Sequence, residues 1–267
     1  MKNQKEFFDS KKTINPKIRI ESLKKLKKII IKCEDEIINA LKMDLGKSYA
    51  EAYMSEIAII YNELNFFIKH TKKWTNRKRV SSSLLNFFSS DYIVPSPYGV
   101  TLNISPWNYP FQLSISPIIG AVSAGNTVVL KPSEHSFNTS KVLEKIINES
   151  FERGHVDIIN GGPEIGKYLL SLKWDYIFFT GSTSIGKIVA KEAAKTLTPT
   201  TLELGGKNPC IIDKNVSIET ASKRIVFGEI FKLWSNMHCS KFLSYSQGRE
   251  RIIREFNYKK SQINLQQ

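Results

Sequence analysis

Hydrophobic positions in the first third of the chain recur with a helical period. Residues 17–47 place apolar side chains such as Leu23, Leu26 and Ile30 on one broad face, which predicts an amphipathic helical region. Residues 50–73 predict a second helical stretch. Residues 81–94 are rich in Ser and aromatic side chains, which is typical of turns and short strands. We therefore expect a helical segment over residues 1–80.

From Gly99 the pattern changes to short apolar runs that alternate with helical stretches. The expected strands are 100–104, 127–130, 156–159, 176–179 and 201–204, and the expected helices are 111–124, 140–151, 165–172 and 184–194. Strands that alternate with helices form βαβ units and a parallel sheet. The sequence predicts an α/β fold, with a doubly wound, mostly parallel, Rossmann-like NAD(P)-binding domain over residues 81–231 and the N-terminal helices packed around it.

The pattern of hydrophobic and polar residues changes again from about Lys232. The segment from Lys232 to Lys241 has no clear period, and the chain beyond Tyr245 is mostly polar and basic. Segments of this composition bury too little apolar surface to offset the entropy of ordering. We expect residues 232–267 to be a disordered tail foreign to the domain before it.

Composition is that of a soluble globular protein. Of 267 residues, 41% are hydrophobic and 24% are charged, but the net charge of +14 is high. Such a charge can indicate a polyanionic partner. It can also reflect coding bias toward Lys, Ile and Asn. The basic residues form no stripe with interleaved aromatic side chains, so we favour coding bias and expect no nucleic-acid partner.

The cysteines are widely separated, at Cys33, Cys210 and Cys239, and show no metal-ligand spacing. Reduced thiols suggest a cytoplasmic protein. Residues 1–12 are polar and lack the apolar core of a signal peptide. No apolar run approaches the length of a membrane span. We therefore expect a cytoplasmic protein without a metal site or a membrane span.

A carboxylate lies between two leucines where the predicted strand 201–204 runs into a Gly-Gly turn. Glu203 is flanked by Leu202 and Leu204, which read as buried strand positions. A half-buried carboxylate holds a proton more readily than an exposed one, which suits a general base. Glu203 is therefore a candidate catalytic base.

An asparagine lies between two prolines in the loop after the predicted strand 100–104. Pro106 and Pro110 constrain the backbone on either side of Asn108. The Asn108 amide can donate a hydrogen bond into a cleft and stabilise an oxyanion, which is worth about 3 kcal/mol in favourable cases. It can equally cap the helix that follows. Spacing alone does not decide between these roles.

Two further segments lie at expected strand ends, where parallel sheets bind ligands. Lys131 and Glu134 follow the strand 127–130; a solvated ion pair is the ordinary interpretation of such residues. Gly181 lies between the strand 176–179 and the next helix, where backbone amides can approach a pyrophosphate. Alone, this glycine more often marks an ordinary turn. Asn160-Gly161-Gly162 reads as another tight turn.

These segments together resemble the motifs of the aldehyde dehydrogenase superfamily. Pro-Trp-Asn-Tyr-Pro stands at 106–110, Gly-Asn-Thr-Val-Val-Leu-Lys-Pro-Ser-Glu at 125–134, Phe-Thr-Gly-Ser at 179–182 and Leu-Glu-Leu-Gly-Gly-Lys-Asn-Pro at 202–209. Their order is that of the family, and the resemblance covers about residues 5–231. The Leu-Gly-Lys segment after Asp44 and the string 195–199 are similar to the class 3, fatty-aldehyde-like branch.

The resemblance implies oxidation of a small-molecule aldehyde to a carboxylic acid with NAD or NADP. In the family a Cys thiolate attacks the carbonyl, an Asn lines the oxyanion hole, and a Glu activates water to release the acid from a thioester. Asn108 and Glu203 match the last two. The residues that match the cofactor site are Trp107, Lys131, Glu134, Gly181, Ser182 and Gly186. A Glu beside the ribose 2′-hydroxyl disfavours a 2′-phosphate, so NAD is favoured. Intact relatives are expected to be homodimers.

The nucleophilic cysteine of the family is absent. It is expected about 34 residues after the general base, within Gly-Gln-Thr-Cys, but that position holds Met237 and the string occurs nowhere in the chain. We therefore expect that most of the catalytic domain is missing and that the chain is inactive. Cys239 could be a displaced nucleophile beside His238. We favour an accidental cysteine, and a core thiol for Cys210.

A one-nucleotide slip of the reading frame near Lys232 would explain the departure. Read one base forward, the codons of Trp234-Ser235 must contain a Gly codon and those of Met237-His238 must contain a Cys codon. Suitable synonymous codons for residues 232–242 spell Asn-Phe-Gly-Gln-Thr-Cys-Ile-Ala-Pro. Two of these identities are forced and the spacing fits, so the hypothesis is that the missing cysteine is still encoded out of frame.

Overall fold

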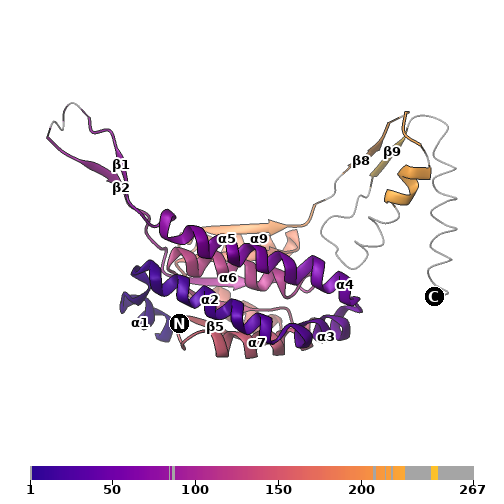
Figure 1. The fold of residues 1–267 in the computed structure, drawn as a ribbon, viewed down its shortest axis with the longest axis horizontal. Coiled ribbons are helices and arrows are strands. Elements are labelled where there is room, and N and C mark those ends of the chain that lie inside the picture. The colour runs from indigo at the N-terminus through magenta and orange to yellow at the C-terminus, as the bar shows by residue number, and fades with distance from the viewer. Residues whose placement is uncertain are drawn as a thin grey trace. The chain divides into compact units, whose positions relative to one another are not determined.

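A computed structural model gives the fold of the chain (Figure 1). The structure describes residues 2–83, 85, 88–206, 209–213, 215–217, 219–225 and 242–245. The chain divides into two compact units, Met1–Glu203 and Leu204–Gln267. The first unit contains the large sheet, the helices that cover it and nearly all of the buried core.

A five-stranded sheet lies at the centre of the first unit, with the strand order β5-β4-β3-β6-β7. Its strands are β3 (Val100–Ile104), β4 (Thr127–Lys131), β5 (Val156–Ile158), β6 (Tyr176–Gly181) and β7 (Thr200–Leu204). The pairs β3/β4, β3/β6 and β4/β5 are parallel. Every residue of β4 is buried, as expected of a strand covered on both faces. The predicted α/β fold with a mostly parallel sheet is confirmed.

Helices connect the strands as the alternation predicts. They are α6 (Gln112–Ala124), α7 (Phe137–Ser150), α8 (Pro163–Ser171) and α9 (Thr183–Ala194). α6 packs on β3 and β4, α7 on β5, and α9 on β6. The chain moves outward from β3 to β5 and then returns to β6 on the other side of β3. The β3 and β6 ends therefore flank the point where the winding reverses, which is where such sheets bind ligands.

The N-terminal helices form a further layer over α6 and α7 (Figure 1). They are α2 (Pro16–Lys32), α3 (Glu34–Leu45), α4 (Tyr49–Ala52), the π-helical turn η2 (Tyr53–Ile57) and α5 (Ala58–Trp74). The predicted helical region 17–47 is interrupted at Cys33, which ends α2 and precedes α3. Side chains such as Leu26, Leu64 and Ile118 belong to one core cluster that also includes strand residues. The domain boundaries predicted near residues 80 and 231 stay predictions.

Two short pairs of strands complete the described chain. In the first unit, β1 (Lys78–Val80) pairs antiparallel with β2 (Asp91–Ile93). In the second unit, β8 (Pro209–Ile212) pairs in parallel with β9 (Phe242–Tyr245). Apart from β9, the tail predicted over residues 232–267 lies outside the described residues.

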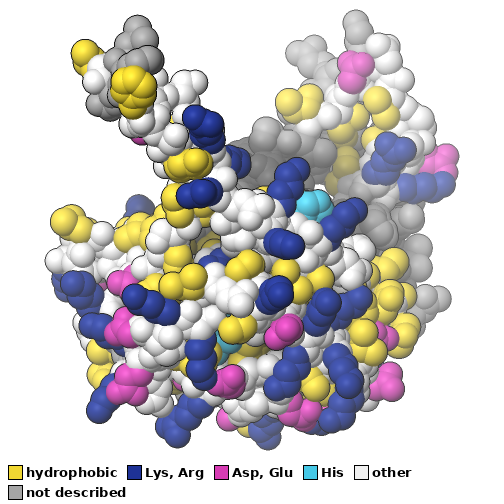
Figure 2. All heavy atoms as spheres, turned by 60° about the vertical axis from the view of Figure 1, so that its left-hand side comes forward, with side chains coloured by type: hydrophobic (Ala, Val, Ile, Leu, Met, Phe, Trp, Pro, Cys, Tyr) yellow, Lys and Arg dark blue, Asp and Glu magenta, His cyan; other side chains and the backbone are white. Residues whose placement is uncertain are grey.

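Charge on the visible face is dispersed, as the sequence suggests. Figure 2 shows Lys and Arg side chains interleaved with acidic, polar and hydrophobic ones.

Within the described part of the chain, none of the helices has both the length and the apolar character that crossing a membrane requires. In the same residues, no group of three or more His, Cys, Asp or Glu side chains could hold a metal ion.

A short helix at the start of the predicted helical segment 1–80, α1 (Lys2–Asp9), docks beside a buried histidine. The Phe7 ring stacks on the His155 ring with centroids 4.9 Å apart, and Gln4 Nε2 donates a hydrogen bond to Asp157. His155 is 3% exposed, and its Nε2 has no hydrogen-bond partner. Burial lowers the pKa of His155 to about 4, although the charge of Glu152 opposes the shift.

This histidine makes the stability of the fold depend on pH. Because its folded-state pKa lies below the ordinary 6.5, the unfolded chain binds a proton that the folded chain rejects between these values. Stability is fully present above about pH 6.5 and is lost as the pH falls toward 4. When the pH falls from 7 to 4.5, the free energy of unfolding measured in urea should decrease by about 2 kcal/mol more in the wild type than in His155→Phe. Equal losses in the two proteins would contradict this assignment.

Candidate active site

The carboxyl end of β4 carries an ion pair between two of the predicted cofactor residues. Lys131 is buried, and its Nζ lies 2.6 Å from Oε2 of the more exposed Glu134. Burial by itself would raise the pKa of Glu134, but the hydrogen bond and positive charge of Lys131 outweigh burial, and the pKa is lowered. Glu134 is therefore ionised at neutral pH, so this strand end presents a fixed carboxylate together with a cation.

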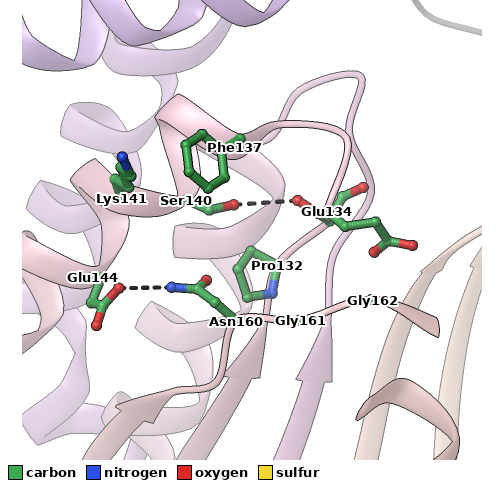
Figure 3. Close-up of a pocket in the computed structure, with 10 residues that line it drawn as sticks. Pro132, Glu134, Phe137, Ser140, Lys141, Glu144, Asn160, Gly161 and Gly162 are labelled. Atoms are coloured by element: carbon green, nitrogen blue, oxygen red, sulfur yellow. Dashed lines mark hydrogen bonds between the residues drawn. The ribbon is translucent and has the colours of Figure 1, made fainter. Parts of the chain in front are cut away.

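A cleft of about 400 Å³ opens beside this pair (Figure 3). Its lining residues are Pro132, Ser133, Glu134, Phe137, Ser140, Lys141, Glu144, Asn160, Gly161 and Gly162. They come from the β4–α7 loop, from α7 and from the segment after β5. A Cβ built on Gly162 would meet no atom within 4 Å, so this backbone faces open space. The volume lies within the range of about 300–1,000 Å³ that is typical of small-molecule sites.

Several lining residues were missed from the sequence. The sequence predicts only a tight turn at Asn160, but Asn160 Nδ2 donates to Glu144 Oε2 at 2.7 Å across the cleft wall (Figure 3). Lys141 Nζ lies 4.3 Å from the centroid of the Phe137 ring. Phe137, Lys141 and Glu144 recur at helical spacing on α7, so the sequence could have placed them on one helix face, but not beside the cleft.

The turn after β6 carries the predicted pyrophosphate residues. Gly181 ends β6, and a Cβ there would lie 2.6 Å from the Phe179 ring, so a side chain does not fit without rearrangement. Ser182 caps α9 by accepting a hydrogen bond from the Ile185 amide at 3.4 Å. Gly186 is buried in the first turn of α9. This leaves a glycine turn and a helix N-terminus at one strand end, an arrangement that favours an anion.

The loop between β3 and α6 holds Trp107 and Asn108. Trp107 is half-buried and Asn108 is 4% exposed. Asn108 Oδ1 is buried and accepts no hydrogen bond, and the N-cap residue of α6 is Phe111. The alternative that Asn108 caps this helix is therefore wrong. Its side chain stays available as a polar group at the ligand-binding edge of the sheet.

Glu203 differs from expectation in its surroundings. Its side chain is exposed, and Leu202 and Leu204 are only partly buried. The prediction of a half-buried carboxylate between buried leucines is wrong for the structure, because β7 is the last strand of the sheet and has a neighbour on one side only. Glu203 lies in β7 and Lys131 ends β4, whereas Asn108 lies in the loop after β3, so the three residues belong to different strands or their loops.

The expected position of the nucleophile lies outside the described residues, as do Met237, His238 and Cys239. The side chain of Cys210 is likewise not described. Cys33 is a buried free thiol, and burial raises its pKa. A buried thiol of this kind forms little thiolate at neutral pH, so Cys33 is a poor nucleophile.

The wall of the cleft is tied to the N-terminal helices through one aspartate. Asp44 Oδ1 accepts hydrogen bonds from the backbone N (3.1 Å) and Nδ2 (2.8 Å) of Asn138. Asp44 Oδ2 accepts from the backbone N and Oγ1 of Thr139, both at 2.7 Å. All four donors belong to the first turn of α7, whose backbone amides have no partner within the helix. A residue of α3 thus caps the helix that forms one wall of the cleft.

The fold and the cleft define an α/β protein of the kind that binds nucleotides at the carboxyl ends of its strands. The sequence profile described as "Aldehyde dehydrogenase family" matches residues 1–233. The chain therefore belongs to the aldehyde dehydrogenase family.

Named relatives agree with this assignment. The chain is 45% identical over 227 residues to the 4,4'-diaponeurosporen-aldehyde dehydrogenase of Staphylococcus aureus, covering 85% of this chain and 50% of that protein. It is 44% identical over 239 residues to aldehyde dehydrogenase family 3 comG of Dictyostelium discoideum, covering 88% and 49%. The chain spans about half the length of the curated relatives it matches.

Solved structures of related proteins show the same fold. A Staphylococcus aureus AldH in a substrate-bound state superposes with a TM-score of 0.91 at 40% identity, over 97% of this chain and 56% of that one. A Mycobacterium tuberculosis aldehyde dehydrogenase complexed with NAD+ superposes with a TM-score of 0.80 at 25% identity, over 91% and 50%.

Removal of the Asp44 cap should destabilise the protein. Asp44→Ala leaves the first-turn donors of α7 without their acceptor, and we expect a loss of about 2 kcal/mol in the free energy of unfolding measured in urea. The control is Asp35→Ala in the exposed first turn of α3, which should cost less than about 0.5 kcal/mol. Comparable losses for the two variants would show that the four hydrogen bonds do not stabilise the fold.

Proposed function

We propose that this chain carries the cofactor-binding part of an aldehyde dehydrogenase that converts an aldehyde, NAD(P)+ and water into a carboxylic acid and NAD(P)H. The observation that carries the proposal is the Lys131–Glu134 pair beside a cleft at the carboxyl end of β4. Family membership supplies the reaction class. When bound, the nicotinamide accepts a hydride from the substrate carbon.

The proposed cofactor residues fit a dinucleotide in three ways. Glu134 and Lys131 can hold the hydroxyl groups of a ribose, because one accepts and the other donates hydrogen bonds. Gly181, Ser182 and Gly186 place a helix N-terminus where a pyrophosphate charge would be stabilised. Trp107 adds an aromatic face from the β3–α6 loop. These assignments rest on the residues' positions at strand ends and on the resemblance to the family motifs.

The proposed catalytic residues form an incomplete set. Asn108 would donate a hydrogen bond to the oxyanion of the attacked carbonyl, and Glu203 would remove a proton from the attacking water. The oxyanion forms when a cysteine thiolate attacks the aldehyde, and the water attacks the thioester that follows hydride loss, so both roles require that cysteine; the residue at the expected position is Met237. We therefore propose that the chain as written does not complete the reaction.

Sequencing the codons for residues 232–242 tests the hypothesis of a slipped reading frame. The hypothesis fails if these codons, read one base forward, cannot spell Gly-Gln-Thr-Cys.

A second candidate function is NAD binding without catalysis. It is favoured by a cleft whose lining residues all belong to the first compact unit. A chain that retains this unit can bind the adenosine end of a dinucleotide whether or not it oxidises aldehydes. Homodimerisation and a cytoplasmic location also stay predictions.

Binding and catalysis should separate experimentally. NAD+ should quench the tryptophan fluorescence of the purified chain. The chain should nevertheless form no NADH when aldehyde is added. Lys131→Met should weaken NAD+ binding about tenfold because a cation is lost from the site, whereas Lys167→Met, an exposed position of α8, should not change it. Absence of NAD+ binding would refute the cofactor site, and aldehyde-dependent turnover comparable to that of an intact relative would refute inactivity.

Cofactor preference should depend on the charge of Glu134. We propose that NAD is preferred, since the ionised carboxylate repels the 2′-phosphate of NADP. Glu134→Gln removes this repulsion, so the ratio of the NADP+ to the NAD+ dissociation constant should fall about tenfold in fluorescence titrations. Glu149→Gln is the matched control, because Glu149 lies on α7 and pairs with Lys32 instead. An unchanged ratio in Glu134→Gln would exclude this role for the carboxylate.

A further inference from the structure

A buried ion pair lies outside the cleft and is not used by the proposed reaction. Lys47 follows α3, Glu56 belongs to η2, and their side chains are 2% and 0% exposed. Lys47 Nζ donates a hydrogen bond to Glu56 Oε1. Removing two charges from water is costly, and an apolar pair of similar volume is often as stable or more stable. Stability alone is therefore a weak reason for these residues to be here.

The remaining hydrogen bonds of the pair all go to one loop. Glu56 Oε2 accepts from the backbone amides of Phe111 at 2.8 Å and Gln112 at 3.1 Å. Lys47 Nζ donates to the backbone carbonyl of Asn108 at 3.2 Å and lies 4.1 Å from the centroid of the Tyr109 ring. The pair therefore holds both sides of the segment 108–112, which contains the proposed oxyanion donor.

The local sequence of the loop explains why it needs an external partner. The first amides of a helix have no acceptor within the helix, and Phe111 at the N-cap has no side chain that can accept a hydrogen bond. Glu56 supplies that acceptor from a different element, and a carboxylate is favoured at the positive end of the helix dipole. Burial raises the pKa of Glu56, while Lys47 and the two amides oppose the rise.

We propose that Lys47 and Glu56 are positioning residues that fix the backbone of residues 108–112 and thereby hold the Asn108 side chain at the active-site edge of the sheet. The proposal rests on the proposed function for the role of Asn108. It concerns neither substrate nor cofactor contact, because the pair acts through the loop. A purely structural role would instead spread its effect over all the helices that pack around the pair.

A matched pair of double variants tests this proposal in the full chain. K47M/E56L keeps the approximate shape but removes every polar group, whereas K47M/E56Q keeps a neutral acceptor for Phe111 and Gln112. Amide hydrogen exchange is measured for residues 105–113 and for α2, α5 and β4, together with the midpoint of unfolding. Glu63→Gln is a further control, since Glu63 lies on α5 and its carboxylate accepts from Ser116 Oγ instead.

We expect K47M/E56L to exchange at least tenfold faster over residues 105–113, including amides that do not bond to Glu56, with α2, α5 and β4 unchanged. K47M/E56Q should stay within about threefold of the wild type at Phe111 and Gln112. Uniform acceleration, loss of the folded state in K47M/E56L, or unchanged exchange over residues 105–113 would each overturn the proposal. NAD+ titration of the wild type tests the proposed function separately, because loop exchange does not depend on cofactor binding.

Discussion

Helix and strand ends that are buried must find hydrogen-bond partners outside their own element, and this constraint organises the carboxyl edge of the sheet. Here the partners come from the segment 44–56, which runs from the end of α3 to η2. Asp44 accepts the first amides of α7, and Lys47 joins Glu56 to hold the loop before α6. One segment thus supports both the wall of the cleft and the loop with the proposed oxyanion donor.

The helix α6 shows the same logic at its two ends. Its first amides meet the Glu56 carboxylate, while the buried Arg19 guanidinium donates to the Ser123 carbonyl at 3.1 Å near its last turn. Thr13 Oγ1 donates to the carbonyl of Gly125, which caps the same end. An anion at the N-terminus and a cation at the C-terminus both complement the helix dipole. The N-terminal helices therefore supply polar caps for α6 in addition to the hydrophobic side chains that they pack against it.

The proposed cofactor residues and the proposed catalytic base Glu203 differ in how fully the structure packs around them. The cofactor residues lie on an edge that is packed and capped by neighbouring helices, so their geometry is set within the first compact unit. Glu203 lies on the outermost strand and is exposed.

The sequence by itself determined the alternation of strands and helices, the family and the position of Lys131, Glu134 and Gly181 at or just after strand ends, because periodicity, turn residues and short motifs are local signals. It did not reveal the docking of α1 on His155, the break of the helical region at Cys33, or the exposure of Glu203. These depend on which surfaces meet, and no local pattern encodes that. Tertiary structure alone decided that Lys47 and Glu56 hold the Asn108 loop and that α7 residues line the cleft. Both arise from contacts between segments distant in sequence, where a buried polar group takes whichever partner the packing brings within hydrogen-bond distance.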